Sequence, residues 1–323
     1  MKRLIAICLA VLALSSCSPQ IQTVTVVAHD SFAISDELIA EFEKDSGYKL
    51  SVVRAGDVGA MTSKLVLTKD SPIADIVYGI DNTFSPVATK NEIIDGELKS
   101  IDYADVCFNV DLNYFREKNL AIPTHWKELT DPKYRNLTVV SNPNTSSPGL
   151  AFLAATYAYL NNPQDIPEPV WWWLALRDNG VKVAASWEDA YYTDFSGSSG
   201  KGKYPIVLSY SSSPAYEVDG QGNPKTQALL KDCFRQTEYA GVLANAKNPD
   251  GANAFIAFML GNSFQSALPE SMYVYPIDKS VKLPEAWEKN AKPATSIVGD
   301  KLDISANREK WLADFNWVFE VAP

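Results

Sequence analysis

Residues 23–82 read TVTVVAHDSFAISDELIAEFEKDSGYKLSVVRAGDVGAMTSKLVLTKDSPIADIVYGIDN. An apolar, β-branched run predicts a buried strand at residues 23–28, and two further strands are expected at residues 48–54 and 74–80. Between them, residues 35–44 carry apolar side chains at helical spacing, and a second helix is expected after Asp57. This alternation with short connections predicts a parallel sheet with helices on both faces.

The rest of the chain repeats this plan. Further strands are expected at residues 106–111, 137–141 and 206–210. Further helices are expected at residues 150–160, 170–177, 249–260, 265–268 and 308–319, and another one opening at 211–214. The sequence therefore predicts an α/β protein of two lobes, with ligand contacts at the carboxyl ends of the strands.

Composition narrows the possible functions. The 323 residues are 46% hydrophobic and 21% charged, which is typical of a folded globular protein. The net charge of −10 argues against a general nucleic-acid binder, which needs a basic face. Two histidines and four cysteines do not form a zinc framework of any usual spacing, and no metal site is expected.

The N-terminus predicts export. Two basic residues precede an apolar run from Leu4 to Leu14, which is too short to span a bilayer and ends at Ser15-Ser16-Cys17. We interpret residues 1–16 as a signal peptide of the lipoprotein type, with Cys17 as the lipidated residue and residues 17–22 as a tether. No later apolar run reaches 18 residues.

Cys107 and Cys233 remain after such cleavage. In an exported protein the two could form a disulfide. Both also lie in apolar segments typical of buried strands. The sequence leaves both possibilities open, and we favour two unpaired thiols.

Four loops are unusually polar for their positions, at residues 29–32, 57–58, 145–149 and 210–216. The last two contain Ser-Ser-Pro before an expected helix, which is an ordinary capping pattern. The additional hydroxyls next to exposed helix amides also suit a phosphate or a hydroxyl group of a ligand. Both interpretations stay open.

Aromatic and acidic residues accompany these loops. Trp187 lies in the first turn of an expected helix, where its ring either packs on its own lobe or projects into a cleft. Tyr210 and Tyr216 flank another helix start, and Asp30 and Asp57 follow strand ends. Aromatic faces combined with carboxylates favour a flat cationic ligand.

No catalytic set is recognisable. There is no Gly-x-Ser-x-Gly elbow and no pair of metal-binding histidines, and Gly200-Lys201 lacks the spacing of a nucleotide-phosphate loop. We therefore expect a binding protein and not an enzyme.

Six segments in order carry a resemblance to a known family. They are residues 29–33 (HDSFA), 74–82 (ADIVYGIDN), 144–150 (NTSSPGL), 186–191 (SWEDAY), 208–216 (LSYSSSPAY) and 264–269 (FQSALP) with Tyr275-Pro276. From about Thr23 to about Phe319 the chain resembles the thiamine-binding periplasmic proteins of bacterial ABC importers, in the larger group that includes iron- and polyamine-binding proteins.

The resemblance implies a two-lobed periplasmic-binding-protein fold that closes on its ligand about a hinge. Residues 23–107 and 233–323 would form lobe 1, and residues 108–232 would form lobe 2, with the ligand cleft between them. The implied function is capture of thiamine or a thiamine phosphate and delivery to a membrane ABC permease with its ATPase. The implied protein is an exported monomeric lipoprotein that needs no cofactor.

The resemblance also implies binding residues: Asp57, Val58, Ser146, Ser147, Trp187, Tyr210, Ser211, Ser212, Ser213 and Tyr216. The serines would hold the hydroxyethyl or phosphate end, Trp187 and Tyr216 would cover the rings, and Asp57 would read the aminopyrimidine or balance the thiazolium. His29, Asp30 and Tyr273 are further candidates. His29 stands where the family usually has Tyr, Tyr273 where Trp is found, and Val58 where Gly is found, so the preferred vitamer stays open.

Three alternatives stay open. A ferric-ion binder of the same fold would use tyrosine oxygens and a carboxylate, and the candidate tyrosines are Tyr191, Tyr192, Tyr210 and Tyr216. A polyamine binder of the same fold is the second alternative. A secreted serine hydrolase is the alternative from another class.

Overall fold

The structure is a computed structural model that describes residues 22–160, 168–299 and 302–322. Its strands are β1 (Thr23–Ala28), β2 (Lys49–Arg54), β3 (Ile76–Asp81), β4 (Ile94–Asp111), β5 (Thr138–Ser141), β6 (Lys182–Ala184), β7 (Ile206–Tyr210), β8 (Thr226–Leu243) and β9 (Tyr275–Pro276). Its α-helices are α1 (Asp36–Ser46), α2 (Val58–Leu67), α3 (Ser85–Lys90), α4 (Leu112–Glu117), α5 (Ser147–Tyr159), α6 (Glu168–Asp178), α7 (Ser196–Ser199), α8 (Pro249–Met259), α9 (Asn262–Ser271), α10 (Glu285–Asn290) and α11 (Ile304–Asn316).

Short helices of other types complete the fold. Those of 3₁₀ type are Trp126–Thr130, Pro132–Tyr134 and Ser213–Ala215, and those of π type are Asp189–Asp194 and Trp317–Val321. The prediction that a helix begins at residues 211–214 is wrong. The chain makes one 3₁₀ turn there and then continues as a loop towards β8.

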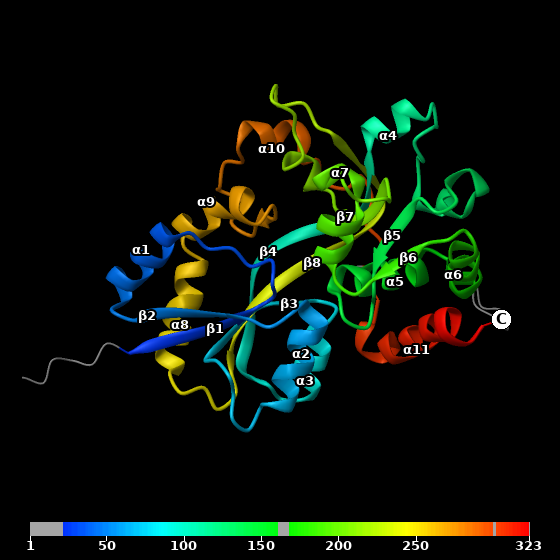
Figure 1. The fold of residues 1–323 in the computed structure, drawn as a ribbon. Helices are drawn as coiled ribbons and strands as arrows, with labels where there is room; N and C mark the ends of the chain where they lie inside the picture. Colours follow the sequence, from blue (N-terminus) through cyan, green and yellow to red (C-terminus); the bar gives the residue numbers. More distant parts are fainter. Residues whose placement is uncertain (1–21, 161–167, 300–301, 323) are drawn as a thin grey trace, which may run out of the picture.

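Two lobes lie on either side of a pair of long central strands (Figure 1). In the described residues the strands run in the order β2-β1-β3-β8-β4-β7-β5-β6, with β9 paired to β4. β4 and β8 have 18 residues each and pair with strands of both lobes, β3 on one side and β7 on the other. The predicted two-lobed α/β fold is confirmed.

The first lobe buries both faces of its sheet, as the apolar runs predicted. Alternate residues of β1 face opposite sides, because strand side chains have a period of two. Val24 and Val26 pack with Phe42 of α1 and Phe255 of α8, whereas Val27 packs with the residues of α2 and α3. Helices therefore cover both faces of this sheet, while the edge strand β2 stays partly exposed.

The expected all-parallel sheet is only partly right. β1 pairs parallel with β2 and β3, and β5 pairs parallel with β6 and β7. β8 runs antiparallel to β3 and β4, and β4 runs antiparallel to β7. The difference arises because β4 takes the chain out of the first lobe and β8 brings it back, so the two strands run in opposite directions.

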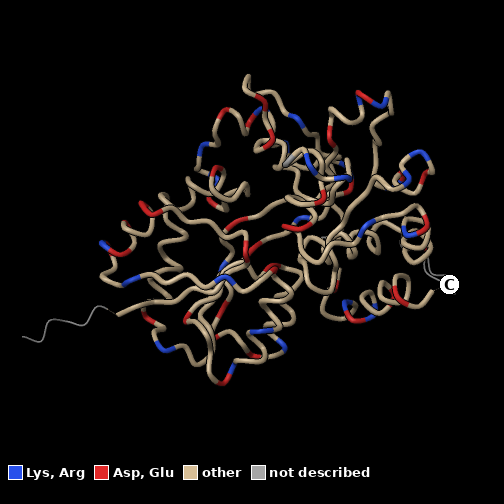
Figure 2. Tube along the Cα trace, in the orientation of Figure 1, with Lys and Arg blue, Asp and Glu red and all other residues tan. Residues whose placement is uncertain are grey.

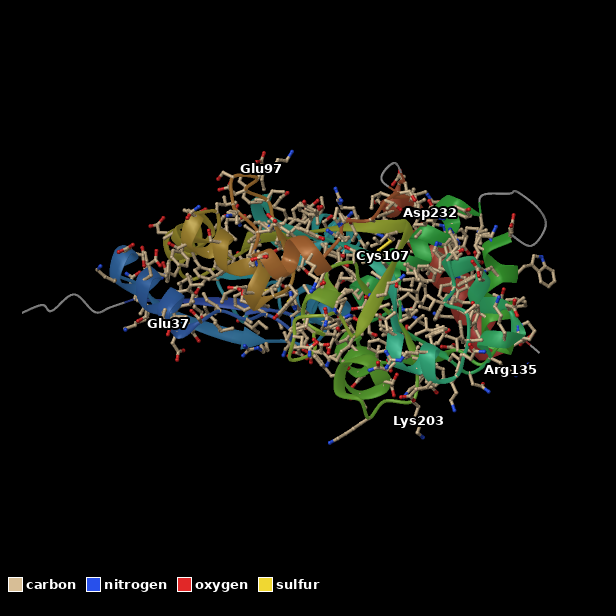
Figure 3. The ribbon with its side chains drawn as sticks, turned by 90° about the horizontal axis from the view of Figure 1, so that it is seen from above. Glu37, Glu97, Cys107, Arg135, Lys203 and Asp232 are labelled. Atoms are coloured by element: carbon tan, nitrogen blue, oxygen red, sulfur yellow. A yellow bond between two sulfur atoms is a disulfide. The ribbon has the colours of Figure 1, made fainter. Side chains whose placement is uncertain are left out.

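Cys107 and Cys233 form a disulfide, so the unpaired thiols that we favoured are wrong. The two residues lie on the adjacent strands β4 and β8, with Cα atoms 5.0 Å apart, although 126 positions separate them in the chain. The yellow bond in Figure 3 lies between these two strands. Only strand pairing brings the two thiols together, and a count of cysteines does not contain that information.

The predicted lobe boundaries fall on this disulfide, and they stay a prediction. The C-terminal helix α11 packs against α5 and α6: the Trp311 ring stacks on Tyr157 at 5.3 Å, and Phe315 meets Trp173 at 5.2 Å. The C-terminal helix α11 therefore lies beside α5 and α6 of the second lobe (Figure 1).

The predicted signal peptide, Cys17 and most of the predicted tether lie outside the described residues. Among the residues that are described, no helix combines the length and the apolar composition needed to cross a bilayer. Acidic and basic residues of the described part of the chain are interspersed along both lobes (Figure 2).

Candidate ligand-binding site

A cavity of about 380 Å³ lies between the lobes, within the range of about 300–1,000 Å³ that is usual for small-molecule sites. Residues at the end of β1 and the start of α2 line it from the first lobe, and residues at the start of α5, around the π helix and after β7 line it from the second. Ten predicted residues contribute to the lining: His29, Asp30, Asp57, Val58, Ser147, Trp187, Tyr210, Ser213, Tyr216 and Tyr273.

Ser146, Ser211 and Ser212 are not part of this lining, although all three are buried. The Ser212 hydroxyl donates to the Tyr273 carbonyl at 2.6 Å and so holds the segment that carries the Tyr273 ring. Ser213 does line the cavity, but its Oγ lies 2.9 Å from Ser209 Oγ and accepts from the Tyr210 amide at 3.3 Å. The binding roles of these serines stay predictions.

The two long strands provide the floor of the cavity. Asp102 and Ala104 of β4 and Gln236 and Glu238 of β8 line it, two positions apart on each strand and therefore on one face. Asp102 is the register partner of Glu238 in this antiparallel pair. The sequence analysis missed these residues, because each carboxylate alone resembles a strand residue that faces solvent.

Tyr78 connects the two acidic residues of the floor. Its hydroxyl donates to Asp102 Oδ2 at 2.5 Å and lies 3.2 Å from Glu238 Oε2. Burial, together with the neighbouring charge of Glu238, raises the pKa of Asp102 well above its ordinary value. The charge of Glu238 therefore disfavours ionisation of Asp102.

His29 lies beside this pair, with Nε2 3.6 Å from Glu238 Oε2. Burial disfavours the charged imidazole, but the negative charges of Glu238, Asp57 and Glu188 favour it, and the pKa of His29 is raised above its ordinary value. Gly79 allows this placement, because a Cβ there would lie 2.2 Å from His29 Cδ2.

Aromatic rings form the wall on the side of the second lobe. The Trp187 ring stacks on Tyr191 at 5.0 Å and meets Tyr192 edge-on at 5.6 Å, and its Nε1 donates to Ser209 Oγ at 3.1 Å. Tyr216 and Tyr273 meet edge-on at 4.7 Å. Of these rings, Tyr191 and Tyr192 are additions to the predicted thiamine site, since the sequence analysis named them only for the ferric alternative.

Three hydrogen bonds join the lobes around the cavity. Asp57 Oδ2 accepts from the Trp187 amide at 2.9 Å, Ser31 Oγ donates to Glu188 Oε1 at 3.0 Å, and the Gly59 amide donates to the Thr145 carbonyl at 2.9 Å. Burial raises the pKa of Asp57, and the amides of Trp187 and Val58 oppose that rise. The structure is therefore a closed form of the two lobes.

The ionisable side chains that line the cavity are mostly acidic, and His29 is the basic side chain among them. Five carboxylic residues take part: Asp30, Asp57, Asp102, Glu188 and Glu238. Among the described residues that line the cavity there is no lysine and no arginine. No group of three or more His, Cys, Asp or Glu side chains in the described residues is arranged to hold a metal ion. An enclosed acidic space with aromatic walls suits an organic cation.

Two lobes closed over a small-molecule cavity define a solute-binding protein. The family of bacterial extracellular solute-binding proteins matches residues 76–295, and this chain belongs to it. The chain accordingly binds a solute and performs no chemistry on it, so the hydrolase alternative is set aside.

Individual relatives are similar over most of the chain. The thiamine-binding periplasmic protein of Escherichia coli K12 is 28% identical over 310 residues, which cover 90% of this chain and 91% of that protein. The thiamine-binding periplasmic protein of Brucella suis is also 28% identical, with 95% of each chain covered. A solved periplasmic thiamin binding protein superposes with a TM-score of 0.82 at 24% identity, covering 93% of this chain and 97% of that one.

Solved structures of other binding proteins share the fold. A ferric binding protein from Campylobacter jejuni superposes with a TM-score of 0.71 at 16% identity, covering 92% of this chain and 99% of that chain. A similarity at that identity shows the fold alone, so the class of ligand has to be inferred from the chemistry of the cavity.

Proposed function

We propose that this protein captures thiamine outside the cytoplasm and delivers it to an ABC permease that works with a separate ATPase. The observation that carries the proposal is the cavity between the lobes, which combines carboxylates with aromatic walls and has no lysine or arginine in its described lining. Thiamine has two flat rings and a permanent positive charge, which match these walls. The thiamine-binding relatives support the same ligand.

Within this proposal Trp187 and Tyr216 cover the rings of thiamine, and Asp57 recognises its aminopyrimidine. Ser147, at the start of α5, contacts the hydroxyethyl end. A diphosphate would bring additional negative charge into a space that already holds Asp57, Glu188 and Glu238. We therefore infer that unphosphorylated thiamine is the preferred vitamer.

Titration of the ligand-free protein tests the function. We expect calorimetry to give one-to-one binding of thiamine, with weaker binding of the monophosphate and weaker still of the diphosphate. Spermidine and ferric citrate are the controls, because the acidic cavity also suits a polyamine. Binding of spermidine without any thiamine form would replace the proposed ligand.

The ferric alternative has less support from the same residues. A ferric site would need tyrosines that ionise readily. Burial raises the pKa of Tyr192 to about 12 and raises the pKa values of Tyr191 and Tyr210 well above their ordinary range. A colourless protein that gives no heat with ferric citrate is expected.

We also propose that residues 1–16 are removed on export and that lipid on Cys17 anchors the protein as a monomer to the membrane. The apolar run from Leu4 to Leu14, which Ser15-Ser16-Cys17 follows directly, supports this. Replacing Cys17 with alanine is expected to release the protein from the membrane fraction. A membrane-bound fraction equal to that of the wild type would rule out the anchor.

A further inference from the structure

Glu238 is a buried carboxylic residue with weak internal partners. Its side chain is only 8% exposed. Its carboxylate oxygens lie 3.2 Å from the Tyr78 hydroxyl, 3.4 Å from Gln236 Nε2 and 3.6 Å from His29 Nε2. The last two distances exceed those of ordinary hydrogen bonds. A buried carboxylate is costly unless a cation and good hydrogen bonds compensate it, so this site favours a positive charge in the cavity.

The neighbouring acid does not share that role equally. Tyr78 makes its short hydrogen bond to Asp102, and the longer one to Glu238. Asp102 is fully buried and has the stronger internal partner, whereas Glu238 is left with the longer contacts. Glu238 is thus the carboxylate of the floor that most needs a cationic partner from a ligand.

His29 is the internal cation closest to this carboxylate. Glu238 faces it from β8, Tyr78 from β3, Asp57 from the turn before α2, and Glu188 from the turn before the π helix. The imidazole lines the cavity, and within the described residues its Nε2 has no hydrogen-bond partner. A protonated ring in this position would compensate the acidic groups while the cavity holds no ligand.

We propose that Glu238 is the counter-ion for the positive charge of the ligand, and that the ligand takes over this position from protonated His29. The idea rests on the proposed function and names the residue that gives the site its preference for a cation. A second positive charge beside Glu238 repels the imidazolium proton, so binding transfers one proton from His29 Nε2 to solvent. Affinity should therefore fall as the pH falls through the pKa of His29 in the free protein.

Replacement of Glu238 by glutamine tests the counter-ion, because it keeps the shape of the side chain and removes the charge. The probes are thiamine and deazathiamine, in which carbon replaces the charged ring nitrogen. We expect Glu238→Gln to weaken the binding of thiamine by about 10- to 100-fold, the range for loss of an interaction with a charged group. The affinity for deazathiamine should change little. Glu97→Gln is the matched control, since Glu97 is an exposed residue of the neighbouring strand β4 (Figure 3), and it should change the affinity for neither probe.

The proton transfer has its own test in the two histidines of the chain. Calorimetry at one pH in two buffers of different ionisation enthalpy counts the protons released on binding. We expect proton release from the wild type, none from His29→Asn, and an unchanged release from His125→Asn. His125 pairs with Asp232 at 2.9 Å and is not among the described residues of the lining.

The outcomes separate this inference from the function on which it rests. A wild-type protein that binds neither thiamine nor deazathiamine would overturn the proposed function and the inference together. If Glu238→Gln loses affinity equally for both probes, or loses none for thiamine, the counter-ion role of Glu238 alone would be overturned. Proton release that persists in His29→Asn would overturn the exchange with His29.

Discussion

Trp187→Ala is expected to weaken thiamine binding by about 1–3 kcal/mol, the range for loss of a stacking and cation–π partner. The indole ring lines the cavity and stacks on Tyr191 at 5.0 Å, so alanine would remove the face that covers the ligand. Calorimetric titration of the variant measures the change. An affinity equal to that of the wild type would remove Trp187 from the site.

Two further variants separate contact with the ligand from support of the fold. Trp187→Phe keeps an aromatic face but loses the hydrogen bond to Ser209, so it should retain more affinity than the alanine variant. Trp171→Ala is the control, because Trp171 is 54% exposed and is not among the described residues of the lining. It should bind thiamine as the wild type does.

Gly59→Ala is expected to reduce affinity by about tenfold, or about 1.4 kcal/mol, by opposing closure of the lobes. A Cβ on Gly59 would lie 2.7 Å from the carbonyl carbon and oxygen of Thr145, across the gap between the lobes. The Gly59 amide also donates to that carbonyl at 2.9 Å. Because the obstacle is backbone, it cannot rotate away, and the lobes must stay apart to accommodate the methyl group.

The same substitution should not weaken α2 itself. Alanine is favoured over glycine inside a helix by roughly 0.5–1 kcal/mol, so the first lobe should keep its stability. Small-angle scattering with saturating thiamine should show a larger radius of gyration for the variant than for the wild type. Gly220→Ala is the control, since a Cβ there meets nothing within 4 Å. Wild-type affinity together with wild-type dimensions would exclude the Gly59 contact from closure.

Much of the cavity was predictable because polar residues follow buried strands. His29 and Asp30 follow β1, and Asp57 follows β2, so their place at the carboxyl edge of the sheet is fixed by the strand pattern. Trp187 was identifiable from the capping Ser186, whose hydroxyl accepts from the Asp189 amide at 3.0 Å. These signals are local in the chain.

The floor was not predictable in the same way. Asp102 and Glu238 are 136 positions apart, and each alone resembles a strand residue facing solvent. They become a buried acidic pair only through the register of β4 against β8. The sequence analysis therefore assigned the negative charge of the site to Asp30 and Asp57 and missed Glu238.

Taken by itself, the sequence determined the two α/β lobes, the strands with apolar runs and most of the polar loops that line the cavity. Hydrophobic periodicity and helix caps are properties of neighbouring residues, so the chain records them directly. Tertiary structure alone decided the disulfide between Cys107 and Cys233, the antiparallel course of β4 and β8, and the pairing of Asp102 with Glu238. Each of these depends on which distant segments pair and in which register, and that choice belongs to the packing of the whole fold.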